Sequence, residues 1–244
     1  MLSVVIPAYN EGSHIYENLG VISDALSKLN MEIEIVPVND GSSDNTHEQI
    51  MLAANNPATN GKIHPVSYSD NKGKGGAIRS GVEAAKGDYI GFLDADLDIS
   101  PDQIEAYVTE LLNQQADVVI ASKMHKDSKL EYPFARKVFS TGYYILLKIL
   151  FGLKVKDTQT GIKIYKASYI KKVVRVQQIK GFAFDIDQLA LVNNLGAQIK
   201  EMPIVLNYSR EASFGRIRIK DIFKMFVDTF KIWWNLRIRK NYKY

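Results

Sequence analysis

The first half of the chain alternates short apolar runs with longer stretches in which apolar residues return at helical spacing. Ile15–Leu29 places apolar side chains three or four positions apart, whereas Leu2–Ile6 and Ile33–Val38 are short runs rich in Val and Ile. The predicted strands are Leu2–Ile6, Ile33–Val38, Ile63–Val66, Tyr89–Leu93 and Val118–Ala121. The predicted helices are Ile15–Leu29, Thr46–Ala54, Ala77–Ala85 and Pro101–Leu112. This alternation predicts an α/β fold with a mostly parallel central sheet, helices on both faces and all the strand ends at one edge.

The rhythm changes after Lys123. A polar loop is expected at 124–131, and the elements expected after it are a helix over Phe134–Leu150, a strand over Ile162–Tyr165, a helix over Asp185–Asn194 and a further apolar stretch over Ile199–Tyr208. No linker rich in Gly, Ser or Pro separates the two halves. We therefore expect one domain over residues 1–210, made of parts 1–123 and 124–210, followed by a basic loop and an amphipathic helix over 211–244.

The last predicted helix, over Ile219–Ile238, gathers its aromatic side chains on one stripe. The stripe comprises Ile219, Ile222, Phe223, Phe226, Phe230 and Trp233, and the basic residues that flank it are Lys220, Lys224, Lys231, Arg237 and Arg239. Such a pattern is typical of a helix that lies at an anionic membrane surface with its rings at the headgroup level. It is equally typical of a surface helix that packs its aromatic residues on the domain, and both interpretations stay open.

Composition and charge narrow the classes of protein. Apolar residues make up 46% and charged residues 24%, as in globular proteins, and the absence of cysteine excludes disulfides, thiolate zinc sites, iron–sulfur clusters and a cysteine nucleophile. The net charge of +4 is uneven, because residues 204–244 hold ten basic and three acidic residues while the part before them is slightly acidic. A basic tail is typical of contact with nucleic acid, an anionic lipid surface or a phosphorylated ligand.

No stretch of the sequence reads as a membrane span or a leader. A spanning helix needs about 20 apolar residues, whereas the most apolar stretch, Tyr143–Val155, has about 13 and contains Lys148. The first ten residues lack the basic start of a signal peptide. We therefore expect a cytoplasmic protein, soluble or peripheral on the cytoplasmic face of a membrane.

The first candidate site is Asp94-Ala95-Asp96, which follows a predicted strand. Two carboxylates at positions i and i+2 can turn toward one hard cation, and Mg²⁺ or Mn²⁺ would bridge them to a diphosphate. A competing interpretation is a calcium-binding EF-hand loop, on the spacing of Asp94, Asp96, Asp98, Ser100, Asp102 and Glu105. However, Ile99 stands where that loop requires glycine, and a strand precedes it in place of a helix.

Two further polar segments carry candidate chemistry. Gly73-Lys74-Gly75-Gly76-Ala77 lies at the start of a predicted helix, where backbone N–H groups bind anions. Asn39-Asp40-Gly41-Ser42-Ser43-Asp44 is a turn with an N-cap in its plainest interpretation, and its carboxylate at a strand end can also accept from a base or a ribose. The motifs GxGxxG, GxxxxGK[ST] and GxSxG do not occur, which disfavours nicotinamide enzymes, P-loop enzymes and serine hydrolases. The four histidines have no metal-ligand spacing.

Taken in order, these segments are far more specific than any one of them. The set runs from Val4-Val5-Ile6-Pro7-Ala8-Tyr9-Asn10-Glu11 through Val38-Asn39-Asp40-Gly41-Ser42-Ser43-Asp44-Asn45-Thr46 and Asn71-Lys72-Gly73-Lys74-Gly75-Gly76-Ala77 to Asp94-Ala95-Asp96. It resembles the family 2 glycosyltransferases, which have the A-type, Rossmann-like nucleotide-sugar fold. The later segments Asp157-Thr158-Gln159-Thr160-Gly161 and Gly181-Phe182-Ala183-Phe184-Asp185 look like the dolichyl-phosphate mannose and dolichyl-phosphate glucose synthase branch.

The resemblance implies roles for the matching residues. The residues that would line the nucleotide-sugar pocket are Pro7, Ala8, Tyr9, Glu11, Asp40, Lys74, Gly75, Asp94, Ala95 and Asp96, with Asp40 on the base or the ribose. The metal, Mg²⁺ or Mn²⁺, would be held by Asp94, Asp96 and Gln159. The two domain parts would then be a nucleotide-sugar half, 1–123, and an acceptor half, 124–210.

On the acceptor side, the resemblance implies that Lys123, Arg136 and Arg216 meet the acceptor phosphate. Lys123 stands where the branch usually has arginine, and lysine lacks the two-pronged contact that arginine makes with phosphate. The basic loop that contains Arg216 and Arg218 fits the branch only loosely. The residues expected to take part in catalysis are Asp96, Asp157, Asp185 and Arg136, the second and third of them by proton handling or orientation.

Together these implications predict a metal-dependent, inverting transfer of a hexose from a nucleotide sugar to a polyprenyl or dolichyl phosphate at a membrane surface. The stretch Phe182-Ala183-Phe184-Asp185 is closer to the glucosyl branch, which favours UDP-glucose over GDP-mannose. A phosphate acceptor carries negative charge near pH 7, because its second pKa is about 6, and so needs no strong general base.

Two other interpretations stay open. In one, an enzyme of the same family uses an aspartate base to transfer sugar to a cell-surface polysaccharide or a protein, so that Asp185→Asn would abolish activity. In the other, the chain is a nucleotide-sugar-binding or lipid-binding module without turnover. Nucleic-acid binding through the basic tail is disfavoured, and it would show a steep salt dependence.

Overall fold

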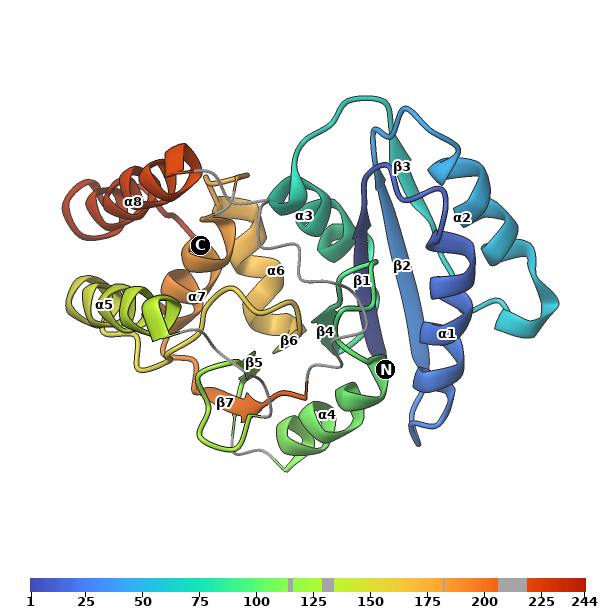
Figure 1. Cartoon of the computed structure of the whole chain (residues 1–244), viewed down its shortest axis with the longest axis horizontal. Coiled ribbons are helices and arrows are strands. Elements are labelled where there is room, and N and C mark those ends of the chain that lie inside the picture. The colour runs from blue at the N-terminus through green and yellow to red at the C-terminus, as the bar shows by residue number, and fades with distance from the viewer. Residues whose placement is uncertain (114–115, 129–133, 182, 206–218) are drawn as a thin grey trace.

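A single seven-stranded sheet forms the centre of the molecule. The computed structural model describes residues 1–113, 116–128, 134–181, 183–205 and 219–244, with the backbone alone over 134–139 and 219–222. The sheet has the order β3-β2-β1-β4-β6-β5-β7 (Figure 1). Its strands are β1 Leu2–Ala8, β2 Ile33–Asp40, β3 Val66–Tyr68, β4 Tyr89–Phe92, β5 Val118–Ser122, β6 Lys163–Lys166 and β7 Ile199–Pro203.

Helices cover both faces of this sheet. They are α1 Ile15–Ser27, α2 Thr46–Asn55, α3 Lys74–Ala84, α4 Ile104–Leu112, α5 Phe134–Phe151, α6 Ala167–Val176, α7 Phe184–Asn194 and α8 Ile219–Trp233. Side chains alternate along each strand, so Val4 of β1 packs with α1, α2 and α4 on one face, and Val5 packs with α3, α6 and α7 on the other. Two buried cores result, and they confirm the predicted α/β fold with a mostly parallel sheet.

One strand departs from the expectation that all the strands end at one edge. β6 pairs antiparallel with both β4 and β5, whereas the pairs β1–β2, β1–β4, β2–β3 and β5–β7 are parallel. The carboxyl end of β6 therefore lies at the opposite edge of the sheet. Six strands still end at the common edge, and the polar segments after β1, β2 and β4 meet there.

Several element bounds differ from the pattern-based prediction. The expected strand Ile63–Val66 is displaced to Val66–Tyr68, because Ile63 makes an isolated bridge to Ile35 and pairing resumes only at Val66. Pro101–Gln103 forms a 3₁₀ turn before α4. Helix α6 was not predicted; it is a short helix with several β-branched residues, and packing on α3 and α7 stabilises it.

The two longest helices, α5 and α8, lie side by side on the left of Figure 1. The Tyr143 ring of α5 meets the Phe226 ring of α8 edge-on at 5.2 Å, and the Tyr143 hydroxyl hydrogen-bonds the Thr229 hydroxyl at 2.6 Å. The chain continues beyond α8 as a π-helical turn, Trp234–Arg239. Within the described residues, no helix combines the length and the apolar character that crossing a bilayer requires.

The close approach of α3 to the sheet generates a prediction about stability. A Cβ placed on Gly81 would collide with Cγ1 of Val5, so we expect Gly81→Ala to lower the free energy of unfolding by about 1–3 kcal/mol. Gly20 of α1 has nothing within 4 Å of such a Cβ, and Gly20→Ala should raise that free energy by up to about 1 kcal/mol. Urea denaturation of both variants measures the difference; equal stabilities would mean that α3 does not press on β1.

Candidate functional site

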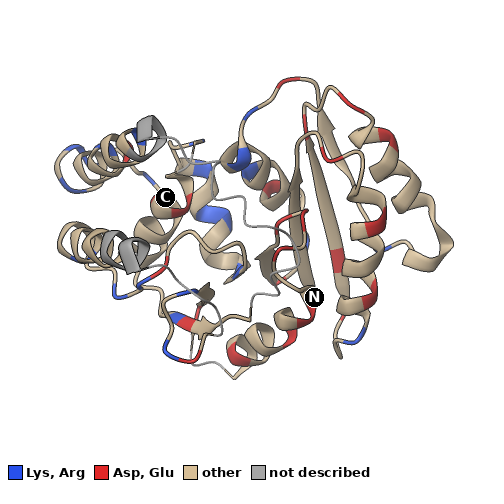
Figure 2. Cartoon of the chain, viewed as in Figure 1, with Lys and Arg blue, Asp and Glu red and all other residues tan. Residues whose placement is uncertain are grey.

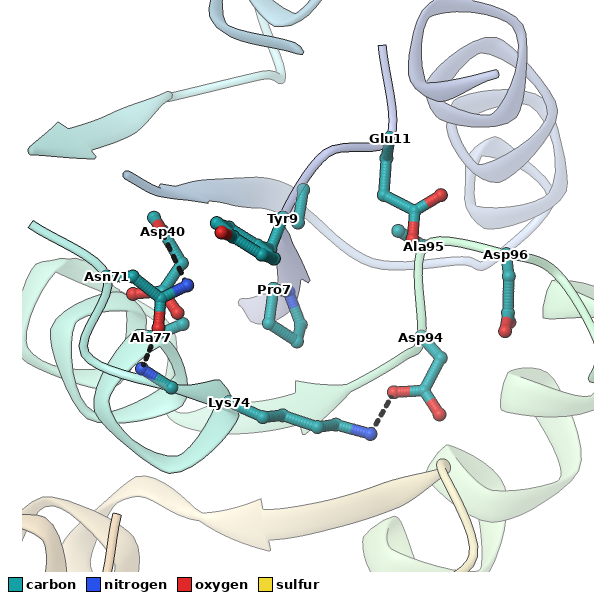
Figure 3. Close-up of a pocket in the computed structure, with 12 residues that line it drawn as sticks. Pro7, Tyr9, Glu11, Asp40, Asn71, Lys74, Ala77, Asp94, Ala95 and Asp96 are labelled. Atoms are coloured by element: carbon teal, nitrogen blue, oxygen red, sulfur yellow. Dashed lines mark hydrogen bonds and ion pairs between the residues drawn. The ribbon is translucent and has the colours of Figure 1, made fainter. Parts of the chain in front are cut away.

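A cavity of about 400 Å³ opens at the carboxyl edge of β1, β2 and β4. The residues that line it are Pro7, Ala8, Tyr9, Glu11, Asp40, Asn71, Gly73, Lys74, Ala77, Asp94, Ala95 and Asp96 (Figure 3). Parallel strands and the helices that follow them place ligand sites at this edge in open α/β folds. The structure thus brings together nine of the ten residues that the resemblance implied for the nucleotide sugar; only Gly75 is not among the lining residues.

Left-handed backbone conformations border the cavity on each side. Asn10, Gly41, Gly73 and Leu97 all have positive φ, between 55° and 75°. A Cβ on Gly41 would lie 2.7 Å from the backbone N of Asn71, so glycine is required where the two loops touch. Leu97 is strained as a branched residue with φ 57°, and it lies in the turn that carries the two aspartates. The backbone at this edge is therefore specialised to place side chains.

Asp40, at the end of β2, is held in one orientation. Its Oδ1 accepts hydrogen bonds from the Tyr68 hydroxyl at 2.7 Å and from the backbone N of Lys72 at 2.8 Å. The ammonium of Lys72 lies 3.7 Å from the centre of the Tyr68 ring, which keeps this group of residues together. Burial raises the pKa of Tyr68, and the neighbouring Asp40 adds to that shift. Because Oδ1 carries both bonds, Oδ2 is the oxygen that Asp40 can offer to a ligand.

An ion pair spans the floor of the cavity. Lys74, in the first turn of α3, places its Nζ 2.5 Å from Oδ1 of Asp94 (Figure 3). Burial acts against the ammonium, but Asp94 and Asp185 outweigh it, so the pKa of Lys74 lies above its usual value. Burial also acts against the carboxylate of Asp94, and the charges of Lys74, Lys163 and Lys123 outweigh it and lower the pKa of Asp94. Both groups are therefore charged at neutral pH.

Asp96 has a different environment from Asp94. Burial raises its pKa, and the negative charges of Asp94 and Asp98 act in the same direction. Its Oδ1 accepts a 3.2 Å hydrogen bond from the backbone N of Asp98, which closes the turn around Leu97. An added cation would stabilise the charged form of Asp96.

The two aspartates fit a hard divalent cation. Carboxylate oxygens are the ligands that Mg²⁺ and Mn²⁺ prefer, and Mg²⁺ usually takes one or two carboxylates together with phosphate oxygens and water. Across the described part of the chain, no three His, Cys, Asp or Glu side chains gather as a complete metal cage. A cation at Asp94 and Asp96 would therefore need a phosphate ligand, and it would compete with the ammonium of Lys74 for Asp94.

Asp185 lies beneath the cavity rather than in it. It is 6% exposed, and its Oδ1 lies 2.6 Å from Nζ of Lys163, which also donates to the carbonyl of Thr160 at 2.8 Å. Burial raises the pKa of Asp185, and the positive charges of Lys163 and Lys74 oppose the rise. This carboxylate is thus an enclosed member of a charge cluster that supports Lys74.

Asp157 organises the loops on the other side of the site. Its Oδ2 accepts from the backbone N of Lys123 at 2.9 Å and from the Thr160 hydroxyl at 2.5 Å, and its Oδ1 accepts from the backbone N of Gln159 at 3.0 Å. These bonds tie the end of β5 to the 157–161 loop. Asp157 thus orders the loops of the chain at this place, and its expected part in catalysis stays a prediction.

The remaining predicted site residues are Gln159, expected as a metal ligand, and the arginines expected on the acceptor side. The side-chain amide of Gln159 donates to the sulfur of Met225 on α8 at 2.9 Å, and Gln159 does not line the cavity. Arg136 lies in the first turn of α5, and its side chain is outside the described residues. Arg216 and Arg218 also lie outside them.

Figure 2 shows basic residues around the start of α3 and on α6, whereas acidic residues predominate on α1 and α2.

Gly75 packs closely against Phe184, whereas a contact with the nucleotide sugar was expected for it. Its backbone N donates to the carbonyl of Lys180 at 3.2 Å, and a Cβ on it would lie 2.7 Å from Cβ of Phe184. Three lining residues, Asn71, Gly73 and Ala77, were not predicted as site residues although they stand in the quoted motif. Asn71 donates to the carbonyl of Asp40 at 3.1 Å and accepts from the backbone N of Gly73 at 3.1 Å, a bridge between loops that only the folded chain shows.

Comparisons with known proteins agree with this arrangement. The family described as Glycosyl transferase family 2 matches residues 3–174. The chain is 32% identical over 223 residues to a dolichyl-phosphate beta-glucosyltransferase of Saccharomyces cerevisiae. The matched region covers 83% of this chain and 66% of the yeast protein. It is 29% identical over 225 residues to a dolichol-phosphate mannosyltransferase of Pyrococcus furiosus, covering 91% of this chain and 61% of that protein. The chain thus spans somewhat less than two thirds of these relatives' length.

Solved structures share the fold. A glucosyl-3-phosphoglycerate synthase of Mycobacterium tuberculosis, in complex with uridine diphosphate, superposes with a TM-score of 0.69 at 18% identity, covering 96% of this chain and 79% of that one. The same enzyme with Mn²⁺, UDP-glucose and glycerol 3-phosphate superposes with a TM-score of 0.67 at 17% identity and the same coverage.

The buried pair beneath the cavity generates a prediction with a pH dependence. Lys163→Met leaves Asp185 enclosed without its main partner, and we expect the free energy of unfolding to fall by about 3 kcal/mol or more at pH 8. The pKa of Asp185 is higher in the folded state than in the unfolded state. The destabilisation therefore grows as pH rises from the unfolded-state pKa to the folded-state pKa, and the loss should be smaller at pH 5 than at pH 8. Denaturant titrations at the two pH values measure it.

Lys166→Met is the matched control, since Lys166 stands on the same strand and pairs with Asp117 in a bridge that is more exposed than that of Lys163 with Asp185. That change should cost no more than about 1 kcal/mol. The double variant Lys163→Met with Asp185→Asn should recover much of the lost stability. A single Lys163→Met variant as stable as the control would contradict the burial argument.

Proposed function

Because the chain belongs to glycosyl transferase family 2, we propose that it transfers a hexose from a nucleotide sugar to the phosphate of a polyprenyl lipid, with inversion at the anomeric carbon. The observation that carries the proposal is a cavity with Asp40 at one end and with Asp94, Asp96 and the ammonium of Lys74 at the other (Figure 3). Hydrogen-bond acceptors for a nucleoside and charges for a diphosphate are thereby arranged in the order in which a nucleotide sugar presents them.

The donor is UDP-glucose in this proposal. Oδ2 of Asp40 would accept from the nucleoside, and the Tyr9 ring, half exposed at the rim, offers it a flat apolar surface. Lys74 would turn from Asp94 to the diphosphate. The relatives named as glucosyltransferases and the mycobacterial structures with UDP or UDP-glucose support this choice over GDP-mannose.

Asp94 and Asp96 would hold Mg²⁺ or Mn²⁺ against the diphosphate. The chemistry that such a bound ion supplies is Lewis-acid stabilisation of the charge that develops on the leaving diphosphate. The pKa of Asp94 already lies below its usual value because of its lysine neighbours, and the added positive charge would also lower the pKa of Asp96. The mycobacterial enzyme has been solved with Mn²⁺ and a UDP-sugar, which supports a metal here as well.

The acceptor is a polyprenyl phosphate in this proposal. Its phosphate is already nucleophilic near pH 7, so the site needs cations more than a base. Asp185 supports this choice over a polysaccharide or protein acceptor, because it is enclosed and paired with Lys163 and therefore poorly placed to act as a general base. Lys123 and Arg136 would meet the acceptor phosphate from the ends of β5 and α5.

The C-terminal helix would hold the enzyme at the membrane that contains this acceptor. Thr229 and Ile232 of α8 are buried against the domain, whereas Phe223 is 71% and Phe230 is 49% exposed. Of the aromatic stripe itself, Trp233 is partly buried against the core. In this proposal the packing interpretation would apply to Trp233 and the membrane interpretation to Phe223 and Phe230. The exposed rings together with the basic residues of this segment suit an anionic lipid surface.

The transfer reaction tests the proposal directly. With radiolabelled UDP-glucose, Mn²⁺ and undecaprenyl phosphate in detergent, we expect labelled lipid from the wild type and at least about a 100-fold lower rate from Asp96→Asn, because a diphosphate leaving group loses its charge stabilisation. Asp102→Asn, an exposed aspartate paired with Lys28, removes the same charge and should keep wild-type activity. Thermal shifts with Mn²⁺ should be larger for UDP-glucose than for GDP-mannose.

Donor binding without label in the lipid would overturn the acceptor assignment and favour another acceptor. No response to any nucleotide sugar with Mn²⁺ or Mg²⁺ would overturn the proposal as a whole. Equal loss of activity in the Asp96 and Asp102 variants would show that the effect does not arise from the cavity.

Vesicle binding tests the membrane contact. Phe223→Ser combined with Phe230→Ser should reduce sedimentation with vesicles of phosphatidylcholine and phosphatidylglycerol by at least about tenfold, since two rings no longer leave water. Leu52→Ser on α2, which is 56% exposed on the other side of the molecule, is the control and should not change binding. Added salt should also weaken binding. A double variant that sediments like the wild type would contradict a lipid contact through α8.

A further inference from the structure

The chain turns back on itself after α8 and ends on α7. Lys240 adopts a left-handed conformation with φ 51°, and the backbone N of Asn241 donates to the carbonyl of Asn235 at 3.0 Å. This reversal carries Tyr242 into the core, where it is 7% exposed. Its hydroxyl donates to Oδ1 of Asp187 on α7 at 2.9 Å. The tail is therefore anchored to an acidic group inside the domain.

Asp187 also binds the loop between α6 and α7. It is fully buried, and its Oδ2 accepts from the backbone N of Gln178 at 2.9 Å and of Ile179 at 3.0 Å. A second bond reaches the same loop from the end of α8, because the Asn235 amide donates to Oε1 of Gln178 at 2.8 Å. A buried carboxylate needs its donors, so the three bonds to Asp187 hold the loop and the tail in one arrangement.

The same loop supports the start of α3. The carbonyl of Lys180 accepts from the backbone N of Gly75, and a Cβ on Gly73 would lie only 3.2 Å from that oxygen. Gly73 and Lys74 line the cavity, and Lys74 reaches Asp94 from there. A continuous series of contacts thus runs from Tyr242 through Asp187 and the 177–181 loop to the residues at the diphosphate end of the cavity.

We propose that Tyr242 is a positioning residue for the donor site, acting through Asp187 and the 177–181 loop on the first turn of α3. The inference rests on the proposed function in that it takes the cavity as the nucleotide-sugar site. Tyr242 touches no reacting group in this arrangement; it sets where the backbone of Gly73 and the side chain of Lys74 stand. The segment after α8 thereby helps to position the residues of the donor pocket.

The test compares Tyr242→Phe with Tyr244→Phe. Both remove one hydroxyl from the tail, but the Tyr244 hydroxyl donates to the carbonyl of Leu191 at 3.3 Å and has no bond to the 177–181 loop. We expect Tyr242→Phe to weaken UDP binding in the presence of Mn²⁺ by about fivefold or more, as loss of one buried bond to a charged group does, and Tyr244→Phe to leave it unchanged. Isothermal titration calorimetry measures the affinity.

Amide hydrogen exchange adds a readout that general loosening does not mimic. In Tyr242→Phe, exchange should quicken in the peptides that cover 177–181 and 73–77, while peptides of β1 and α1 keep their wild-type rates. In turnover, KM for UDP-glucose should rise with little change in kcat. Faster exchange confined to 240–244, with UDP affinity unchanged, would overturn the proposal.

A second variant covers the case in which Tyr242→Phe fails to fold. Gln178 is exposed, so Gln178→Ala removes the bond from Asn235 without emptying a buried position, and it should weaken UDP binding in the same direction by a smaller factor. Faster exchange over 177–181 in Gln178→Ala with unchanged UDP affinity would then overturn the proposal, because loosening this loop would not reach the donor site. Failure of the wild type to bind UDP would instead count against the proposed function, so the two failures are distinguishable.

Discussion

Everything at this site depends on how opposite charges are balanced beneath the cavity. Two aspartates stand where a diphosphate would lie, and a diphosphate cannot approach them unless cations compensate both partners. The protein supplies Lys74 against Asp94 and, one layer deeper, Lys163 against Asp185. Each charged group is stabilised by more than one neighbour, because Asp185 also acts on Lys74 and Lys163 also acts on Asp94. An arriving cation therefore enters a site whose charges are already in position.

Backbone geometry makes this arrangement possible. The first turn of α3 lies close to the 177–181 loop, where a side chain on Gly73 or Gly75 would press on the carbonyl of Lys180. Farther along α3, Gly81 leaves room for Val5 of β1 and Val38 of β2. The strained turn at Leu97 places Asp94 and Asp96 on one loop at the end of β4. Because these close contacts involve segments far apart in the chain, the rigidity of the site comes from the packing of the domain as a whole.

The C-terminal segment from α8 onward supports loops of the site. Helix α8 contacts the 157–161 loop through Met225 and Gln159, and the segment after it contacts the 177–181 loop through Asn235 and Gln178. α8, which carries exposed aromatic residues, and the turn that follows it thus touch loops on both sides of the site. In the proposed function, the surface that would meet the lipid and the pocket that would hold the donor belong to one mechanical unit.

The sequence by itself determined the alternation of strands and helices, the edge at which the polar segments meet, the family, and nine of the twelve residues that line the cavity. Local periodicity and ordered motifs are sufficient for these, because they depend on near neighbours in the chain. Only the tertiary structure decided that β6 runs antiparallel, that Asp185 is enclosed by Lys163, that Gly75 packs on Phe184, and that Gln159 turns to Met225. Those features arise from contacts between distant segments, whose direction, burial and hydrogen-bond partners are set by the packing of the complete fold.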